Sequence, residues 1–221
     1  MAHDFKTHNL VFSTPWHSIF ERDNWYALHS PTCISGGGAL IMDADQNILL
    51  VEIYRHPLDE VLLEIPRGGF DPEKDSTGLS AAIREAQEEA GIDLADAEVI
   101  DLGTFFPDSG ILAFELSICA AILPHSFANP EPDLNEVVGY RIMPFAELLN
   151  RAANGDIKDA STIVAAFRLQ RILKESASTQ LIEILDQDGE VVRTIETERP
   201  DWSFNQFIRN RDASGWTWRA I

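Results

Sequence analysis

Apolar residues recur with two different spacings along this chain. From 79 to 90 they fall at positions 79, 82, 83, 86 and 90, the spacing of one face of an α-helix. Shorter apolar runs bounded by Gly, Pro, Asp or Asn predict β-strands at 39–42, 48–54, 61–65, 97–100, 113–122 and 136–142. Further helices are expected at about 144–154 and 161–176. Strands and helices interleave, which predicts an α/β (α+β) domain.

The two ends of the chain predict extensions. Residues 1–35 carry scattered aromatic side chains and are expected to form short antiparallel strands: Phe12, Trp16, Phe20, Trp25 and Tyr26. Near the C-terminus, runs at 181–185 and 190–195 flank an Asp-Gly turn and predict a hairpin. Later aromatics are expected to dock on the domain or on a second subunit: Trp202, Phe204, Phe207, Trp216 and Trp218. We divide the chain into 1–35, 36–175 and 176–221.

Composition narrows the classes of partner and compartment. The formal net charge of −19 argues against a nucleic-acid scaffold, because phosphate backbones are held largely by Lys and Arg. It leaves small phosphate substrates open, since a metal ion and a few arginines can supply local positive charge. Cys33 and Cys119 are expected as free thiols. No apolar run reaches membrane-spanning length and no signal peptide is evident, so we expect a cytoplasmic protein without a membrane partner.

The predicted helix at 79–90 carries the strongest chemical signal. Glu85, Glu88 and Glu89 form an acidic stripe beside the apolar one. Their spacing puts the Cβ atoms about 5–6 Å apart, where like charges destabilise a helix by a few tenths of a kcal/mol per pair. A solvated acidic face is the ordinary interpretation, and a hard divalent cation that gathers the carboxylate oxygens is the alternative. Gly91 is the expected left-handed C-cap.

The neighbours of these glutamates favour the metal. Residues 84–92, Arg-Glu-Ala-Gln-Glu-Glu-Ala-Gly-Ile, resemble the second half of the Nudix hydrolase signature, Gly-x5-Glu-x7-Arg-Glu-U-x-Glu-Glu-x-Gly-U, where U is bulky and apolar. The first half departs from it: counting from Gly69, the acidic position is Asp75 instead of Glu, and eight residues separate it from Arg84. In that family the early glutamate supports the loop and the arginine, so the loop is where this chain is expected to differ.

The resemblance implies a fold and a metal site. The fold is a Nudix-like α/β/α sandwich with a mixed sheet over about 36–175. Glu85, Glu88 and Glu89, with the carbonyl of Gly68, would hold Mg²⁺ or Mn²⁺, and Glu85 thereby takes part in catalysis. Arg84 would orient the carboxylates, with a surface ion pair as its alternative role.

Four further patterns resemble the ADP-ribose and nucleotide-sugar pyrophosphatase branch of the family. They lie at 52–57, 63–66, 107–110 and 155–162, although Arg67 stands where that branch more often has a small residue. The resemblance implies an enzyme that hydrolyses the pyrophosphate bond of a small nucleotide such as ADP-ribose or an ADP-sugar. Many relatives in this branch form dimers, so a homodimer is compatible with the chain.

The same resemblance suggests the remaining site residues. Glu136 would be the general base, or equally a strand-end residue or a further metal ligand. Arg55 would hold a terminal phosphate and Glu64 a ribose or base, each with a structural ion pair as an equal alternative. Ser109 and Gly110 would approach the phosphates through their backbone. Trp16, Trp25 and Tyr26 would stack on a base or pack between subdomains.

A different class of function is kept beside the enzyme. The altered first half of the signature would suit a non-catalytic Nudix-like module that senses a nucleotide. The intact Glu85, Glu88 and Glu89 argue against it, because a sensor has no need of a metal cluster. Binding without turnover would distinguish the two.

Overall fold

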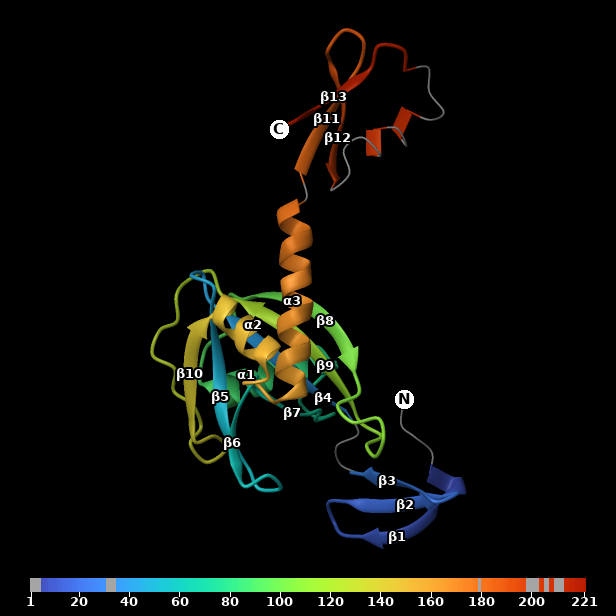
Figure 1. Ribbon diagram of the computed structural model, residues 1–221, viewed down its shortest axis with the longest axis vertical. Coiled ribbons are helices and arrows are strands. Elements are labelled where there is room, and N and C mark those ends of the chain that lie inside the picture. Colours follow the sequence, from blue (N-terminus) through green and yellow to red (C-terminus); the bar gives the residue numbers. More distant parts are fainter. Residues whose placement is uncertain (1–4, 31–34, 179, 198–202, 205–206, 209–212) are drawn as a thin grey trace. The chain divides into compact units, whose positions relative to one another are not determined.

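The fold is seen in a computed structural model that describes residues 5–30, 35–178, 180–197, 203–204, 207–208 and 213–221 (Figure 1). The chain forms two compact units, Met1–Arg168 and Leu169–Ile221. The first contains a mixed sheet with helices and the second a small antiparallel sheet. The predicted α/β (α+β) class with extensions at both ends is confirmed.

The first unit is built on a seven-stranded sheet in the order β10-β5-β4-β9-β8, with β6 paired to β5 and β7 to β4. β4 and β9 run parallel along their whole length and the other pairs are antiparallel. The strands are β4 (Ser35–Met42), β5 (Asn47–Arg55), β6 (Glu60–Glu64), β7 (Arg67–Gly69), β8 (Glu98–Phe105), β9 (Glu115–Ile122) and β10 (Gly139–Pro144). The predicted strands are therefore present, and β7 is an addition.

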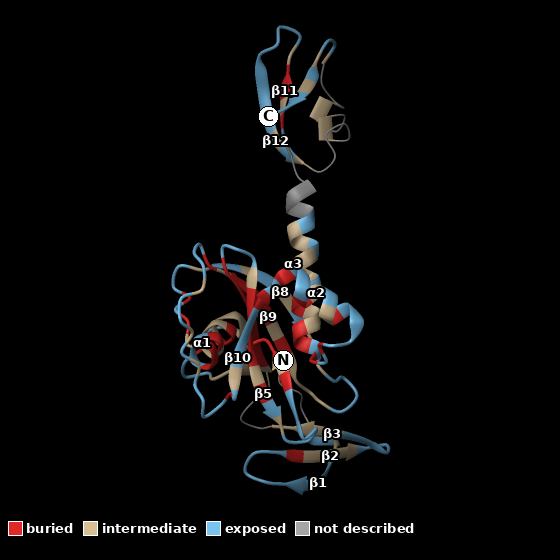
Figure 2. Ribbon diagram, turned by 60° about the vertical axis from the view of Figure 1, so that its left-hand side comes forward, coloured by how far each residue is buried: buried red, intermediate tan, exposed pale blue. Residues whose placement is uncertain are grey.

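Helix α1 (Gly78–Ala90) packs on β4, β5 and β9, while α2 (Phe145–Asn154) contacts β5 and β10. Figure 2 shows α1 on one side of the sheet and α2 on the other, and α3 (Ala160–Ser178) follows α2. α1 approaches very closely, because a Cβ on Gly37 of β4 would lie 2.2 Å from the backbone nitrogen of Ala82. Small residues on both elements thus allow the close approach of α1 to β4.

The N-terminal residues form the predicted antiparallel strands. A 3-10 turn, η1 (Phe5–Thr7), precedes β1 (Asn9–Ser13), β2 (Ser18–Arg22) and β3 (Trp25–His29). Asp23 and Asn24 both have positive φ, as the tight turn between β2 and β3 requires. The N–H of Leu28 bonds the carbonyl of Ile111, which joins β3 to the loop before β9.

The second unit contains the predicted hairpin and a strand that the sequence pattern did not reveal. β11 (Gln180–Leu185) pairs with β12 (Val191–Thr197) on one side and with β13 (Thr217–Ala220) on the other. Gly189 has a φ of 79°, consistent with the predicted turn. Ile182 and Ile184 are fully buried. Trp202 and Cys33 lie outside the described residues.

Two further predictions can be compared with the described residues. Cys119 is buried and forms no disulfide, as expected. Within the part of the chain that the structure describes, none of the helices has the length and apolarity needed to cross a bilayer.

Candidate active site

Helix α1 is held at both ends by local caps. The side chain of Thr77 accepts the N–H of Ser80, and the Ser80 hydroxyl accepts the N–H of Thr77, so two backbone donors are satisfied. At the other end Gly91 takes the left-handed conformation and donates its N–H to Gln87, as predicted. These caps set the rotation of the helix that carries Arg84 and the three glutamates.

The loop before α1 is fastened to Arg84 by Asp75. Nε and Nη2 of Arg84 donate to the two carboxylate oxygens of Asp75 at 3.1 and 2.8 Å, and Nη2 also donates to the carbonyl of Gly69 at 2.8 Å. The Asp75 side chain is 1% exposed, and these bonds hold the pKa of its carboxyl below the usual value. The N–H of Asp75 bonds the carbonyl of Asp71 in a tight turn. The shorter acid thus still connects loop and arginine.

Arg84 also contacts two of the three glutamates. Its Nη1 lies 2.9 Å from Oε1 of Glu85 and 2.8 Å from Oε2 of Glu88. The Asp75 bonds, followed by the charges of Glu85, raise the pKa of the guanidinium. Because the Arg84 side chain is only 19% exposed, its contacts with the carboxylates differ from an ordinary ion pair on the surface. It joins the loop to the acidic stripe.

The acidic stripe is not a solvated face. Glu89 is buried and its Oε2 accepts the N–H of Arg67 at 2.9 Å. Burial, with the charges of Glu85 and Glu136, raises the pKa of Glu89 to about 7. Burial likewise raises the pKa of Glu85, against the opposing effect of Arg84. Glu88 is about half exposed. The environment therefore disfavours the ionised forms of Glu85 and Glu89.

Gly68 gives the Glu85 carboxylate its space. A Cβ on Gly68 would lie 2.1 Å from the carboxyl carbon of Glu85, so any larger residue would push this carboxylate away. The carbonyl oxygen of Gly68 points toward Gly36 of β4, where an added Cβ would be 2.4 Å away. Its role as a metal ligand stays a prediction.

The donor set suits a hard cation. Glu85, Glu88 and Glu89 offer only oxygen atoms, which Mg²⁺ and Mn²⁺ prefer. Burial raises the pKa values of Glu85 and Glu89, so ionisation of these carboxyls is disfavoured, and a bound divalent cation would favour it. Among the described residues, however, no three Asp, Glu, His or Cys side chains already converge as a complete metal site. Glu88 is instead turned toward Arg84.

Glu136 lies in a turn beside α1. The N–H groups of Glu136 and Val137 bond the carbonyl of Asp133, and Val137 is buried in the core cluster that includes Ala86 and Ala90. This anchor keeps Glu136 close enough for its charge to raise the pKa values of Glu85 and Glu89. β10 begins only at Gly139, so the strand expected from 136 starts later, because the turn at Asp133 uses the preceding backbone groups.

Arg55 and Glu64 meet each other. Arg55 donates through Nε at 2.7 Å and through Nη2 to the two oxygens of Glu64, whose side chain is 1% exposed. Arg67 donates to the same carboxylate, and Asp159 and Thr162 continue the network. The structure thus shows Arg55 and Glu64 in an ion pair with each other, which is the structural alternative given for both residues. The sequence reasoning named Arg67 and the pattern at 155–162 but assigned no role to Arg67, Asp159 or Thr162, although Asp159 three positions before Thr162 is a recognisable helix cap.

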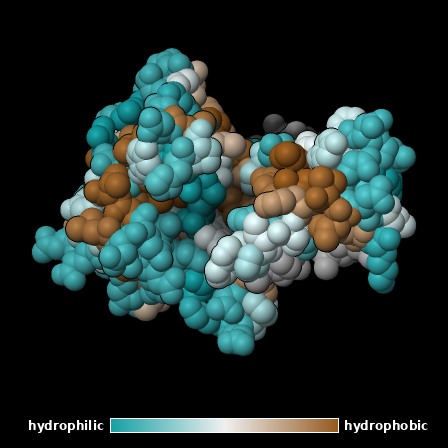
Figure 3. Space-filling model, turned by 90° about the horizontal axis from the view of Figure 1, so that it is seen from below, coloured by the Kyte–Doolittle hydropathy of each residue, from teal (hydrophilic) through white to brown (hydrophobic). Residues whose placement is uncertain are grey.

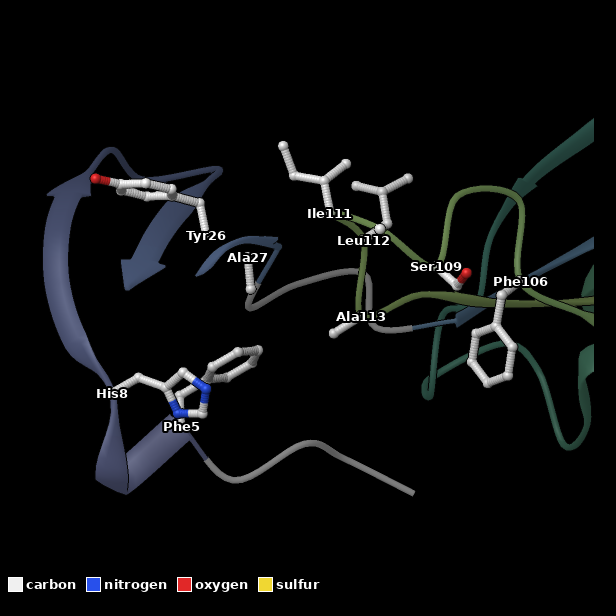
Figure 4. Close-up of a pocket in the computed structure, with 10 residues that line it drawn as sticks. Phe5, His8, Tyr26, Ala27, Phe106, Ser109, Ile111, Leu112 and Ala113 are labelled. Atoms are coloured by element: carbon white, nitrogen blue, oxygen red, sulfur yellow. The ribbon is translucent and has the colours of Figure 1, made fainter. Parts of the chain in front are cut away.

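Ser109 and Gly110 lie elsewhere, in a loop closed by Asp108. The N–H of Gly110 bonds the Asp108 carboxylate at 3.0 Å. Both residues line a cavity of about 360 Å³ that none of the three glutamates lines. Figure 4 shows the cavity between the N-terminal strands and this loop; its other lining residues include Phe5, His8, Tyr26, Phe106 and Ile111. No partner for Nδ1 of His8 is found among the described residues.

Trp16, Trp25 and Tyr26 do not pack between subdomains of the described chain. Trp25 is 75% exposed, Trp16 67% and Tyr26 53%. Leu10, Val11 and Phe12 of β1 are also exposed. Figure 3 looks onto this end of the molecule and shows apolar surface, in brown, among hydrophilic areas.

Comparison with known proteins identifies the family of the domain. The family model described as NUDIX domain matches residues 35–164, more than half of the chain. A protein of Arabidopsis thaliana named "Nudix hydrolase 14, chloroplastic" is 34% identical over 73 residues. That match covers 33% of this chain and 23% of the relative, so the chain spans under a quarter of the relative's length.

Proposed function

Because this chain belongs to the NUDIX family, we propose that it is a metal-dependent hydrolase of the pyrophosphate bond in a nucleoside diphosphate linked to another group. ADP-ribose or an ADP-sugar is the preferred substrate class, with a nucleoside monophosphate as one product. One observation carries the proposal. Glu89 is buried, Glu85 is 13% exposed and lies against Gly68, and burial raises the pKa of both carboxyls, while Arg84 and Asp75 tie the preceding loop to this stripe.

The proposed chemistry follows from the charge of the substrate. Water forms a bond to one phosphorus atom, the bond from that phosphorus to the bridging oxygen breaks, and the departing phosphate keeps the electron pair. A divalent cation, when bound, supplies charge neutralisation and alignment. Glu85 and Glu89 are its proposed ligands with Glu88 and the Gly68 carbonyl, and Arg84 orients Glu85 and Glu88. Glu136 is the proposed base that takes the proton of the water.

Other residues support a nucleotide as the substrate. Arg55 uses Nε and Nη2 on Glu64, and we assign its Nη1 to a terminal phosphate. The cavity at Ser109 and Gly110 is lined by Phe5, Tyr26 and Phe106, whose rings suit stacking on a base. Glu64 is saturated by two guanidinium groups, which favours its structural role over a contact with ribose.

The assembly and the compartment are also proposals. The exposed apolar residues of β1 and the exposed Trp25 of β3 favour a homodimer through the N-terminal sheet, because large exposed apolar patches usually mark interfaces. Sedimentation analysis over a range of concentrations tests this. Cytoplasmic location stays a prediction from the sequence.

The test of the activity is a substrate panel with Mg²⁺ and with Mn²⁺, read by identifying the products. We expect ADP-ribose or an ADP-sugar to yield a nucleoside monophosphate only when the metal is present, and Glu89→Gln to abolish the release. Tight nucleotide binding without any product would instead support the sensing module. Turnover that persists in chelator with Glu89→Gln would contradict the proposed metal site.

A further inference from the structure

One guanidinium group joins two elements beside the candidate metal site. Nη2 of Arg67 lies 2.7 Å from Oε2 of Glu64 and 3.2 Å from Oδ1 of Asp159. Glu64 is at the end of β6, and Asp159 directly precedes α3. Both carboxylates are almost fully buried, at 1% and 8% exposed, and Arg67 is 27% exposed. The contact therefore lies in a poorly solvated region, where a charge-assisted hydrogen bond has strong directional effect.

The same network continues into α3. The second oxygen of Asp159 accepts both the N–H and the hydroxyl of Thr162, each at 2.8 Å. The Thr162 hydroxyl in turn accepts the N–H of Ile65 at 2.9 Å. The segment from Glu64 to Arg67 is thus attached to the start of α3 at two points, one through backbone and one through the Arg67 side chain.

The backbone of Arg67 reaches the candidate metal ligands. Its N–H donates to Oε2 of Glu89, and the next residue, Gly68, makes the space for the Glu85 carboxylate. Arg67 faces Gly38 in the pairing of β7 with β4, where an added Cβ on Gly38 would lie 3.0 Å from the Arg67 Cβ. A shift of Arg67 would therefore displace the surroundings of both Glu85 and Glu89.

We propose that Arg67 is a positioning residue for the divalent metal site: its side chain fixes β7 on Glu64 and Asp159, so that β7 holds Glu89 and leaves room for Glu85. The inference rests on the proposed function, since it assumes that these glutamates bind a metal. It also gives a role to an arginine at a position where the ADP-ribose and nucleotide-sugar pyrophosphatase branch more often has a small residue.

The geometry predicts which substitutions matter. When the Arg67 charge is removed, Glu64 keeps its ion pair with Arg55 and Asp159 keeps two hydrogen bonds from Thr162, so both carboxylates retain hydrogen-bond donors and the fold should survive. Because a single nitrogen contacts both carboxylates, lysine can replace part of the interaction, although its amine reaches less far. Methionine keeps the apolar stem and removes the charge.

The test is direct titration of the whole protein with Mn²⁺, followed by electron paramagnetic resonance of the free ion. We expect Arg67→Met to weaken Mn²⁺ binding by about tenfold or more, the usual effect of losing an outer-shell partner, and Arg67→Lys to fall between it and the unaltered protein. The matched control is Arg141→Met, which removes the Arg141–Glu52 ion pair (2.9 Å) on β10 and β5 and should leave Mn²⁺ affinity unchanged. Raised Mg²⁺ should restore most of the turnover of Arg67→Met, with the KM for the nucleotide unchanged.

The outcomes separate this inference from the function on which it rests. Unchanged Mn²⁺ affinity in folded Arg67→Met would overturn the positioning role while leaving the metal site intact. If Arg67→Met does not fold, Asp159→Asn replaces it, since asparagine still caps α3 but removes the carboxylate charge that Arg67 contacts. We expect a weakening of the same direction there, and unchanged affinity would again overturn the role. Failure of the unaltered protein to bind Mn²⁺ would contradict the proposed function itself, and this inference with it.

Discussion

The acidic face of α1 and the N-terminal sheet differ from ordinary protein in opposite ways. On α1, Glu89 is 7% exposed, whereas on β3, Trp25 is 75% exposed. Buried carboxylates and exposed large apolar side chains are the informative departures from the usual distribution of residues. Burial of the first disfavours its ionised form, which the proposed cation would favour, and exposure of the second leaves apolar surface in water, which the proposed second copy would cover.

The largest expected effect is on the pH dependence of stability without metal. Glu89 has a pKa near 7 in the folded protein and an ordinary value of 4.5 in the unfolded chain. Between these values the folded state binds more protons, so its stability falls as the pH rises from about 4.5 to 7 and is constant above. The shift corresponds to a loss of about 3 kcal/mol. Unfolding by denaturant in chelator, from pH 4.5 to 8, measures it.

Two controls make this prediction specific. Glu89→Gln should flatten the slope, because glutamine does not titrate. Saturating Mg²⁺ should also flatten it, because a bound cation favours the ionised carboxylate. An identical slope in Glu89→Gln would mean that another group titrates in this range. Burial of Glu89 would then no longer distinguish α1 from the N-terminal sheet.

The next effect concerns Gly68. Its substitution tests whether the Glu85 carboxylate must occupy the space that Gly68 leaves. Gly68→Ala would place a methyl group 2.1 Å from the Glu85 carboxyl carbon and force the carboxylate away. We expect a loss of about a hundredfold in kcat/KM, as for a displacement of about 1 Å of a catalytic group. The matched control is Gly139→Ala, whose Cβ meets only the flexible end of Glu52 at 3.1 Å. Equal activity of the two variants would show that Glu85 needs no such space.

Asp75→Asn tests the loop that differs from the family pattern. Asp75 is almost fully buried and bonded twice to Arg84, so the substitution should lower the free energy of unfolding by about 2 kcal/mol at pH 7. The pKa of Asp75 is lowered from 3.8, so its contribution is present above that value and is lost as the pH falls below it. The variant and the unaltered protein should therefore approach each other in stability at low pH. A difference that stays constant from pH 7 to pH 3 would contradict the ion pair.

The smallest effect is expected in the N-terminal sheet, where Trp25 lies. Trp25→Ser should change the free energy of unfolding by less than about 0.5 kcal/mol, because the side chain is mostly in solvent. Leu49→Ala in the core, by contrast, should lose about 2–5 kcal/mol. If Trp25 lies in a dimer interface, its replacement should instead raise the dissociation constant of the dimer in sedimentation. A large loss of stability in a protein that stays monomeric at all concentrations would show that Trp25 is packed after all.

Sequence reasoning predicted the elements well because their periodicity is local. The α1 stripe, the strands of the sheet and both extensions follow from apolar spacing and turn residues. Spacing says nothing about which distant strands pair, so the parallel ladder of β4 and β9 was not predicted. The strand predicted at 39–42 begins earlier, at Ser35, because the three glycines at 36–38 pair with β7 on one side and β9 on the other.

Only part of the candidate site was predicted, because spacing reveals contacts within one helix and does not reveal contacts between distant segments. The three glutamates and Arg84 share one helix, so their proximity follows from the spacing. Arg67 meets Asp159, and Thr162 meets Ile65, only through tertiary contacts, and no local pattern joins positions so far apart in the chain. The burial of Glu89 was likewise not predicted, because the spacing of an acidic stripe does not show whether other elements of the fold cover it.

The most direct test of the metal-dependent hydrolase is the release of nucleoside monophosphate from ADP-ribose by the unaltered protein and by Glu89→Gln, each with Mg²⁺ and with chelator. Release by the unaltered protein in Mg²⁺, with loss of at least two orders of magnitude in the other three conditions, is the expected result. Equal release by Glu89→Gln, or release that chelator does not reduce, would contradict the assignment of buried Glu89 and the neighbouring glutamates of α1 to a catalytic metal.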